Sequence, residues 1–195
     1  MGSRLDMKRI MIDIDDVITD TRGFLKIVND FLNSNYTIDD VDGYYIQDLV
    51  PVNLREKFNN YMMTQNLYQL DNINNDCAEV IKRLNETYDI YICSAFVYRD
   101  KLEYSGKLLT DKFDFLTRNF SFLDPNHFTF QTNKSIFNCH IKIDDKIENL
   151  EGAELKILFT AYHNKHLTED YLNQLRITRV HNWLEIEEIL KEGNN

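Results

Sequence analysis

The chain has 195 residues, 43% of them hydrophobic, and a formal net charge of −10 at pH 7. This length predicts one domain, or one domain with an insertion, and enough chain to bury a sizeable core. Only six glycines and two prolines exclude collagen-like and Pro/Gly-rich disordered classes. The negative charge argues against nucleic-acid polymers and anionic membranes as partners, because both would be repelled without a basic patch.

The start of the chain and its cysteines bear on the compartment. Residues 1–6 are interpreted as the remnant of an expression tag ahead of a native Met7. No apolar run reaches the roughly 18 residues of a membrane span, and no signal peptide is found. Cys77, Cys93 and Cys139 are widely spaced and lack the spacing of zinc ligands. We therefore expect a cytoplasmic protein with buried thiols.

Hydrophobic periodicity gives the elements in chain order. Short apolar runs predict strands at residues 8–14, 88–93, 128–131, 140–143, 156–160 and 178–180. Apolar residues at helical spacing predict helices at residues 23–33, 54–62, 74–86 and 183–190. Strands separated by helices favour an α/β fold, in which a Rossmann-like parallel sheet is flanked by helices.

One connection is too long for a simple crossover. About fifty residues separate the first predicted strand from the helix at residue 74, and they contain two helical patterns. We predict that residues 20–75 form a small helical cap inserted after the first strand. Residues 7–19 and 76–195 would then form the core. A long ordered loop is the alternative interpretation of the same segment.

Polar side chains follow the predicted strands at the points where the strands end. They are Asp13, Asp15 and Asp16 after the first strand, Ser94 after the second, Lys134 beyond the third, and Asp144 and Asp145 after the fourth. In open parallel sheets, ligands bind at the carboxyl ends of the strands. Carboxylates gathered there would repel one another unless a hard cation joined them, and oxygen-only ligands select Mg²⁺. A carboxylate beside Mg²⁺ and a bound phosphate can attack phosphorus, so this set predicts phosphoryl transfer.

With these residues in this order, the chain resembles the haloacid dehalogenase superfamily and, in its details, the 5′(3′)-deoxyribonucleotidases. The matching stretches are residues 11–17, 91–94, 133–134, 143–145, 157–167 and 180–183. The superfamily motifs are general to phosphatases, whereas the stretch at 157–167 is more specific to the nucleotidases. The resemblance runs over nearly the whole chain after residue 6.

The resemblance implies roles for the acids. Asp13 would be the nucleophile that takes the phosphoryl group. Asp15 would be the general acid for the leaving oxygen and then the base for water. Asp13, the backbone carbonyl of Asp15 and Asp144 would hold Mg²⁺, with Asp145 close by as a further metal residue.

The resemblance also implies a phosphate site and a base site. Ser94 and the backbone N–H of Ala95 would bind phosphate oxygens, and Lys134 would neutralise the charge that develops on the phosphoryl group. The cap would close over the base and exclude water. Cap aromatics are candidates for stacking on a nucleobase, with simple packing inside the cap as the alternative; they are Phe24, Tyr44 and Tyr45.

Three positions depart from the family pattern. The family usually has glycine where this chain has Asp16, which bears on the loop beside the metal. It often has Thr-Ser where Ser94-Ala95 stands, so one hydroxyl is missing from the phosphate site. It often has arginine where Lys146 stands, and a lysine lacks the planar two-point grip of arginine.

These observations predict an Mg²⁺-dependent phosphatase of nucleoside monophosphates, with pyrimidine deoxynucleotides favoured and a homodimer left open. Mg²⁺ and Lys134 would invert the local potential, so that an acidic protein could bind a phosphate. Three alternatives stay open. The same chemistry could act on sugar phosphates or other small phosphomonoesters. A receiver-like signalling module has similar groups, although its acid pair precedes the phosphorylated Asp and it has no cap. The departures also allow a binding protein without turnover.

Overall fold

The computed structural model describes residues 7–69 and 73–192, and these form a six-stranded sheet. Its strands are β1 (Arg9–Ile12), β2 (Asp89–Ser94), β3 (Phe128–Phe130), β4 (Cys139–Asp144), β5 (Ala153–Phe159) and β6 (Ile177–Val180). All neighbours are parallel, in the order β3-β2-β1-β4-β5-β6. The predicted parallel α/β fold is therefore confirmed. Connections run in opposite directions on the two sides of β1, so the carboxyl ends of β1 and β4 form a topological switch point.

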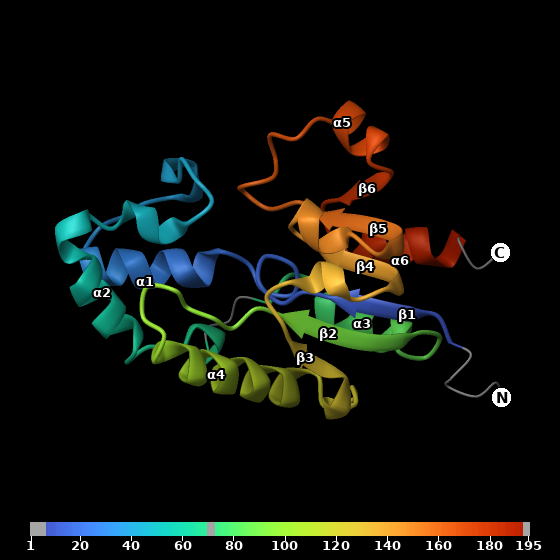
Figure 1. The fold of residues 1–195 in the computed structure, drawn as a ribbon, viewed down its shortest axis with the longest axis horizontal. Helices are drawn as coiled ribbons and strands as arrows, with labels where there is room; N and C mark the ends of the chain where they lie inside the picture. The colour runs from blue at the N-terminus through green and yellow to red at the C-terminus, as the bar shows by residue number, and fades with distance from the viewer. Residues whose placement is uncertain (1–6, 70–72, 193–195) are drawn as a thin grey trace.

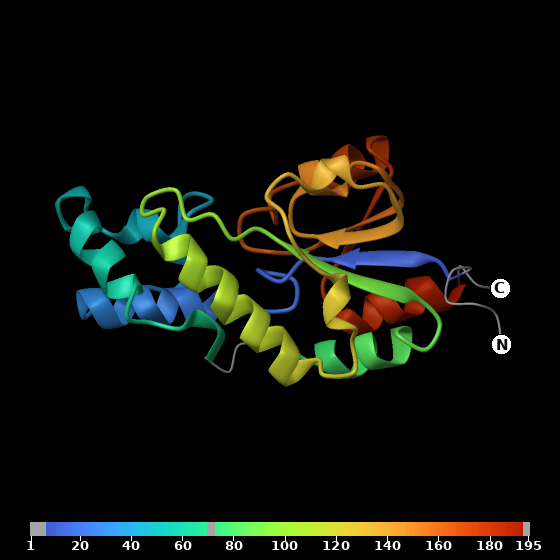
Figure 2. The same cartoon turned by 60° about the horizontal axis from the view of Figure 1, so that its bottom comes forward.

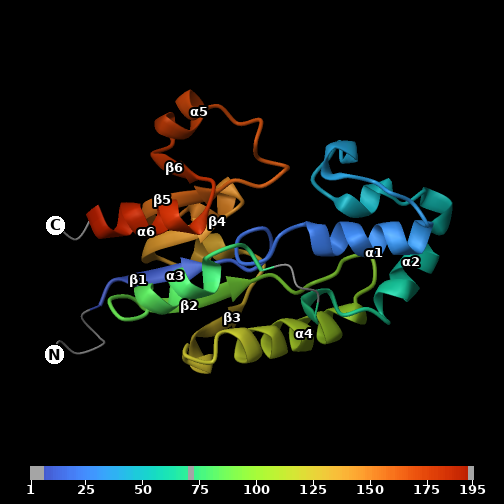
Figure 3. The ribbon, with the colours of Figure 1, turned by 180° about the vertical axis from the view of Figure 1, so that it is seen from behind.

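Helices cover the two faces of the sheet unequally. On one face lie α3 (Cys77–Leu84), α6 (Trp183–Glu192) and, beside β3, the long α4 (Tyr104–Asn119) (Figures 1 and 2). The opposite face carries shorter elements next to β4, β5 and β6, namely η8 (Ile147–Leu150) and α5 (Glu169–Gln174). Figure 3 shows α3 and α6 side by side in front of the strands.

The sheet core forms between the strands and the first set of helices. Cys77, Val80, Ile81 and Leu84 recur at helical spacing, so α3 presents one apolar stripe to the strands. Trp183 at the start of α6 is fully buried in the same cluster. Its indole N–H donates to the carbonyl oxygen of Val17 at 3.0 Å, which ties α6 to the loop that follows β1.

A second group of helices lies beyond the carboxyl ends of the strands (Figure 1). It consists of α1 (Arg22–Leu32), α2 (Arg55–Met62), η2 (Ile38–Asp40), η3 (Ile46–Leu49), η4 (Val52–Leu54) and η5 (Leu67–Gln69). Their apolar side chains form a separate cluster that contains Val28 and Phe58. Tyr104, from the first turn of α4, is buried in that cluster too. The cluster therefore extends beyond residues 20–75, and the boundaries of a cap domain stay a prediction.

The sequence patterns located every strand, but the helix α4 was not among the predicted elements. Its N-terminal end packs with Phe58 and its C-terminal end, at Phe115, belongs to the sheet core. It thus bridges the two clusters, and Lys112, a charged residue at a buried position, interrupts the apolar stripe that would have identified it. With 16 residues α4 is the longest helix described, and none of the described helices could cross a membrane.

Two further points concern the predicted segments that are not described and the residue at which β1 ends. The tag remnant expected at residues 1–6 and part of the predicted cap, residues 70–72, lie outside the described residues. β1 ends at Ile12, earlier than predicted, because the chain turns back after it. The backbone N–H groups of Ile18 and Thr19 both donate to the carbonyl oxygen of Ile14, at 2.9 Å each. This turn presents the acids that follow β1 to one side of the sheet edge.

Candidate active site

The first acid of the chain lies in a buried ion cluster at the switch point. Asp13 follows β1, and its N–H donates to Ile143 of β4 at 3.0 Å, which continues the β1–β4 pairing by one residue. The ammonium of Lys134 lies 2.7 Å from a carboxylate oxygen of Asp13 and 2.6 Å from one of Asp144. Lys134 is only 2% exposed. The cation therefore holds two carboxylates from adjacent strands in one place.

The environment sets the protonation of these groups. Burial raises the pKa of Asp13 to about 6, although the charge of Lys134 counteracts part of that rise. The same burial opposes the charge on Lys134, but Asp13 and Asp144 outweigh it and raise the lysine pKa. At pH 7 Asp13 is therefore a carboxylate, which is the form that a nucleophile requires.

Asp144 and Asp145 complete the acidic group. One oxygen of Asp144 accepts from the backbone N–H of Lys146 at 3.0 Å and from the side-chain amide of Asn149 at 2.9 Å. Asp145 pairs with Nε2 of His163 at 2.7 Å. Burial, followed by the charge of Lys146, lowers the pKa of His163 to about 4, so the imidazole is neutral at pH 7. A neutral imidazole protonated at Nε2 donates to Asp145 and fixes its orientation.

These acids suit a hard cation. Single carboxylate oxygens of Asp13, Asp144 and Asp145 all lie within 4.8 Å of one another, and all three residues are buried. Burial raises the pKa of Asp145 well above its ordinary value, and the charge of Asp144 raises it further. Such mutual repulsion is relieved by a divalent cation, and an all-oxygen donor set suits Mg²⁺. The carboxylate of Asp15 is not in this group; the resemblance assigned its backbone carbonyl to the metal.

Asp15 belongs to a second cluster, built around Lys112 of α4. The ammonium of Lys112 lies 2.6 Å from a carboxylate oxygen of Asp15 and 2.7 Å from Oγ of Ser94, and it also donates to the carbonyl of Ala95. The hydroxyl of Tyr68 donates to the other oxygen of Asp15 at 2.5 Å. Burial would raise the pKa of Asp15, but the charge and hydrogen bond of Lys112 outweigh it and lower that pKa.

Lys112 was not among the predicted site residues. The residue is 1% exposed, and it occupies the apolar face of α4, between Leu108 and Phe115. A lysine at a position of helical spacing among apolar residues was the available signal, because a buried ammonium requires partners. Ser94, by contrast, was predicted to bind phosphate directly. Its hydroxyl is fully buried and accepts from Lys112 in this conformation.

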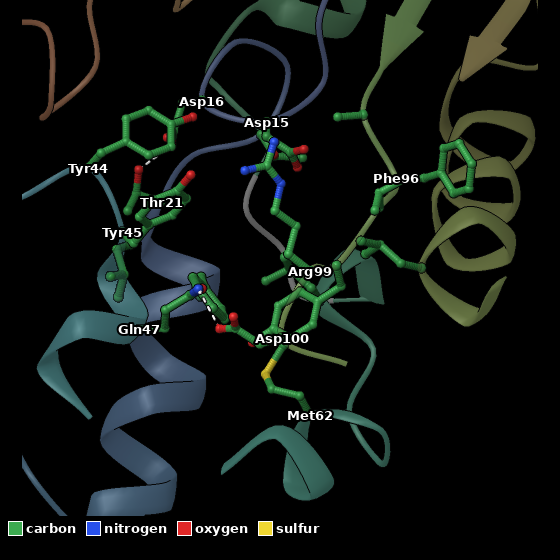
Figure 4. Close-up of a pocket in the computed structure, with 18 of the residues that line it drawn as sticks. Asp15, Asp16, Thr21, Tyr44, Tyr45, Gln47, Met62, Phe96, Arg99 and Asp100 are labelled. Atoms are coloured by element: carbon green, nitrogen blue, oxygen red, sulfur yellow. Dashed lines mark hydrogen bonds between the residues drawn. The ribbon is translucent and has the colours of Figure 1, made fainter. Parts of the chain in front are cut away.

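A cavity of about 600 Å³ opens between the Lys112–Asp15 cluster and the helices beyond the strand ends. Figure 4 shows Asp15 and Asp16 at one end of it, with Gln47, Asp100 and Met62 toward the other end. The predicted base-stacking residues Phe24, Tyr44 and Tyr45 all line the cavity, as does Ala95. Its volume lies within the range typical of small-molecule sites.

The aromatic residues differ in how they are held. Phe24 packs against Phe58 at 6.2 Å between ring centroids, so it belongs to the second apolar cluster as well as to the cavity wall. The ammonium of Lys146 lies 4.2 Å from the ring centroid of Tyr44. Tyr44 also makes an edge contact with His163, at 4.6 Å between centroids. Lys146, which departs from the expected arginine, thus forms a cation–π contact with Tyr44 in the cavity wall.

Asp16, another of the three departures, adopts the left-handed backbone conformation with φ of 58°. Glycine adopts it without steric cost, and aspartate does so more readily than most residues. The Asp16 carboxylate accepts a hydrogen bond from the hydroxyl of Thr21 (Figure 4). Burial raises its pKa to about 7, against the lowering effect of Thr21. Asp16 therefore occupies a backbone conformation that favours glycine, and it adds a titratable carboxyl.

Comparisons with known proteins agree with this architecture. The sequence model of the family described as "5' nucleotidase, deoxy (Pyrimidine), cytosolic type C protein" matches residues 7–193. A Staphylococcus epidermidis protein named "Putative 5'(3')-deoxyribonucleotidase" is 32% identical over 182 residues, which cover 92% of this chain and 94% of that protein. A nucleotidase of Clostridium acetobutylicum is 27% identical over 192 residues and covers 93% of each chain.

Solved structures show the same fold at low sequence identity. A haloacid dehalogenase-like hydrolase of Xanthomonas campestris superposes with a TM-score of 0.56 at 11% identity, with 95% of each chain covered. A magnesium-bound hydrolase of the same type from Bacillus subtilis gives 0.54 at 13% identity, covering 94% of this chain and 98% of the other. Because the family model spans residues 7–193, the chain belongs to the 5′ nucleotidase, deoxy (pyrimidine), cytosolic type C family and is a phosphatase of the nucleotidase kind with the haloacid dehalogenase fold.

Proposed function

We propose that the protein hydrolyses pyrimidine deoxyribonucleoside monophosphates in an Mg²⁺-dependent reaction that passes through a phosphorylated Asp13. One observation carries the proposal. The buried carboxylate of Asp13 is held by Lys134 beside Asp144, and Asp15, two residues further along the chain, lines a cavity of about 600 Å³ with aromatic walls. A nucleophile that serves a roomy aromatic cavity suits a substrate with a phosphate at one end and a flat ring at the other.

The metal site would be formed by Asp13, Asp144, Asp145 and the backbone carbonyl of Asp15. Bound Mg²⁺ would neutralise negative charge on the phosphate oxygens. The magnesium found in the Bacillus subtilis hydrolase supports this assignment by analogy of fold. The protein's own side chains carry out the nucleophilic attack and the proton transfers.

In the first step, a carboxylate oxygen of Asp13 attacks phosphorus while the bond from phosphorus to the sugar oxygen breaks. Asp15 gives a proton to that leaving oxygen. In the second step, Asp15 takes a proton from water, which attacks phosphorus and releases inorganic phosphate with Asp13 restored. Asp15 needs a raised pKa to carry the first proton. Lys112 now lowers it, and a bound phosphate that drew the Lys112 ammonium away would raise it.

The test is a phosphate-release assay over dUMP, dTMP, dCMP, the ribonucleotides and ribose 5-phosphate, with Mg²⁺ or with a chelator. Asp13→Asn should abolish turnover of every substrate, because an amide cannot form the phosphorylated intermediate. Asp114→Asn, an exposed position on α4, is the matched control and should keep wild-type rates. Circular dichroism confirms that both variants are folded.

Three results would contradict the proposal. Full activity of Asp13→Asn would exclude the phosphorylated aspartate. Undiminished activity with chelator would exclude the metal. Equal rates on ribose 5-phosphate and on nucleotides would favour a phosphatase of small phosphomonoesters, the alternative that the motifs alone left open.

A further inference from the structure

We propose that Lys142 is a positioning residue, which holds Lys134 in place for the reaction by binding its backbone rather than its side chain. The inference rests on the proposed function, because it concerns the lysine that neutralises charge on the transferred phosphoryl group. Lys142 belongs neither to the sequence motifs nor to the two ion clusters described above.

Lys142 is a fully buried lysine of β4. Ile141 and Ile143, on either side of it, belong to the sheet core, so alternation along the strand directs Lys142 to the opposite face of the sheet. The residue is 0% exposed, and within residues 7–69 and 73–192 its ammonium forms no ion pair. A buried charge without a carboxylate partner is costly unless hydrogen bonds compensate for the lost water.

The ammonium finds its hydrogen bonds at two backbone carbonyl oxygens. It donates to the carbonyl of Lys134 at 2.9 Å and also to the carbonyl of Glu151, which directly follows η8. The segments that contain these carbonyls both contact Asp144. Lys134 pairs with its carboxylate, and Asn149 of η8 donates to the same carboxylate. Lys142 therefore joins the backbones of the two segments that hold Asp144.

The segment that carries Lys134 has little support of its own. Residues 131–138 connect β3 to β4 past two other strands, and they contain one short helical turn, η7 (Lys134–Ile136). A parallel crossover usually takes a dozen or more residues and an α-helix. In the turn, the carbonyl of Lys134 accepts from the N–H of Phe137 at 3.2 Å. A cavity of about 200 Å³ borders Phe137 and residues of β1, β2 and β3, so packing alone does not fix this segment.

The backbone contact matters because the side-chain partners of Lys134 are themselves reacting groups. Its ammonium lies 2.7 Å from Asp13 and 2.6 Å from Asp144. In the proposed reaction Asp13 becomes phosphorylated and Asp144 serves the metal, so both carboxylates are then engaged elsewhere. The hydrogen bond from Lys142 to the Lys134 carbonyl involves neither acid. It therefore keeps the Lys134 ammonium within reach of the phosphoryl group during the transfer, when a small displacement would be most costly.

The experiment measures kcat and KM for dUMP with saturating Mg²⁺ in the wild-type chain, in Lys142→Met and in Lys156→Met. Lys156 is the matched control. It lies opposite Lys142 in the register of β4 and β5, and it binds the same residue, Glu151, but through an exposed carboxylate. Lys142→Met should lower kcat about tenfold and leave KM within about twofold, because the contact acts after the acids are engaged. Lys156→Met should leave both constants unchanged.

A double-mutant cycle shows whether Lys142 acts through Lys134. In Lys134→Met there is no ammonium to position, so adding Lys142→Met should change kcat by less than about twofold. If the two separate losses multiply instead, the inference is overturned. A wild-type kcat in folded Lys142→Met overturns it as well, and so does a loss that falls on KM alone.

Hydrogen exchange provides a readout that needs no turnover. The backbone amides of residues 134–137 should exchange faster in Lys142→Met than in Lys156→Met, because the turn has lost its anchor. Equal exchange overturns the inference, whereas a wild-type protein that hydrolyses no nucleotide refutes the proposed function instead. If circular dichroism shows that Lys142→Met is unfolded, Lys142→Gln replaces it. The amide is uncharged and one bond shorter, so the same loss of kcat and the same coupling to Lys134 are expected.

Discussion

Lys134 should contribute more to the stability of this protein than any exposed lysine, because it is the buried counter-ion of two buried carboxylates. We consider Lys134→Met, which keeps the length of the side chain and removes its charge. The lysine is 2% exposed, and the side chains of Asp13 and Asp144 are 9% and 2% exposed. Solvent therefore screens these ion pairs little, and water does not solvate the carboxylates that lose their partner.

The expected cost follows from that burial. Removing one partner of a buried ion pair costs about 3–5 kcal/mol, since the charges that remain are desolvated and uncompensated. For a chain of this size, each kcal/mol lowers Tm by roughly 2–4 °C, so the variant should melt roughly 6–20 °C below the wild type. The deficit should shrink toward pH 5. Asp13, with its pKa raised to about 6, is mostly protonated there even in the wild type.

The assay is thermal and urea unfolding at pH 7 in the presence of a chelator, so that no divalent cation substitutes for the lysine. Lys156→Met is the matched control. Lys156 also has a carboxylate at 2.7 Å, but that partner, Glu151, is 61% exposed. An exposed pair contributes at most about 1 kcal/mol. Equal, small losses in both variants would refute the argument that burial of the ion cluster sets its energy.

Two further predictions concern Lys112 and Asp16. Lys112→Met should lower kcat/KM by about 10²-fold through loss of a phosphate contact, and it should shift the basic limb of the pH profile of kcat/KM upward, because Lys112 lowers the pKa of Asp15, the proposed proton donor of the first step. An unshifted limb would contradict that electrostatic role. Asp16→Asn should flatten the pH dependence of stability in chelator. The native pKa of Asp16 is raised to about 7, so its stabilising contribution is full below pH 4 and is lost as pH rises through 7. Urea unfolding of the wild type and of Asp16→Asn at pH 5 and pH 8 measures this contribution. An equal loss of unfolding free energy between the two pH values in both proteins would contradict the prediction.

The sequence predicted the fold well because its strands are short apolar runs that end on acids. Such runs identify a parallel sheet that is buried on both faces, and the order of the motifs fixes which strand carries which acid. Asp13, Lys134 and Asp144 indeed meet through ion pairs at one strand edge. Phe24 and Tyr44 do line the cavity, as expected for residues that follow the first strand.

Other parts of the site depended on packing between distant segments. α4 escaped prediction because its apolar stripe is interrupted and serves two clusters at once, so Lys112 escaped with it. Tyr68 and His163 reach Asp15 and Asp145 from 53 and 18 residues away along the chain. Hydrophobic periodicity reports only local structural preference, so it cannot predict contacts between residues this far apart in the chain.

The negative charge of the chain shows most clearly what the sequence determined and what the tertiary structure determined. By itself, the sequence determined that the protein is acidic and that its acids follow the ends of β1 and β4. It also determined the parallel sheet that brings those ends together. Only the tertiary structure decided which cation compensates which acid, since Lys134 holds Asp13 and Asp144 while Lys112 holds Asp15. The reason is physical: a buried charge is stable only with a partner within a few ångströms, and folding selects that partner from the whole chain.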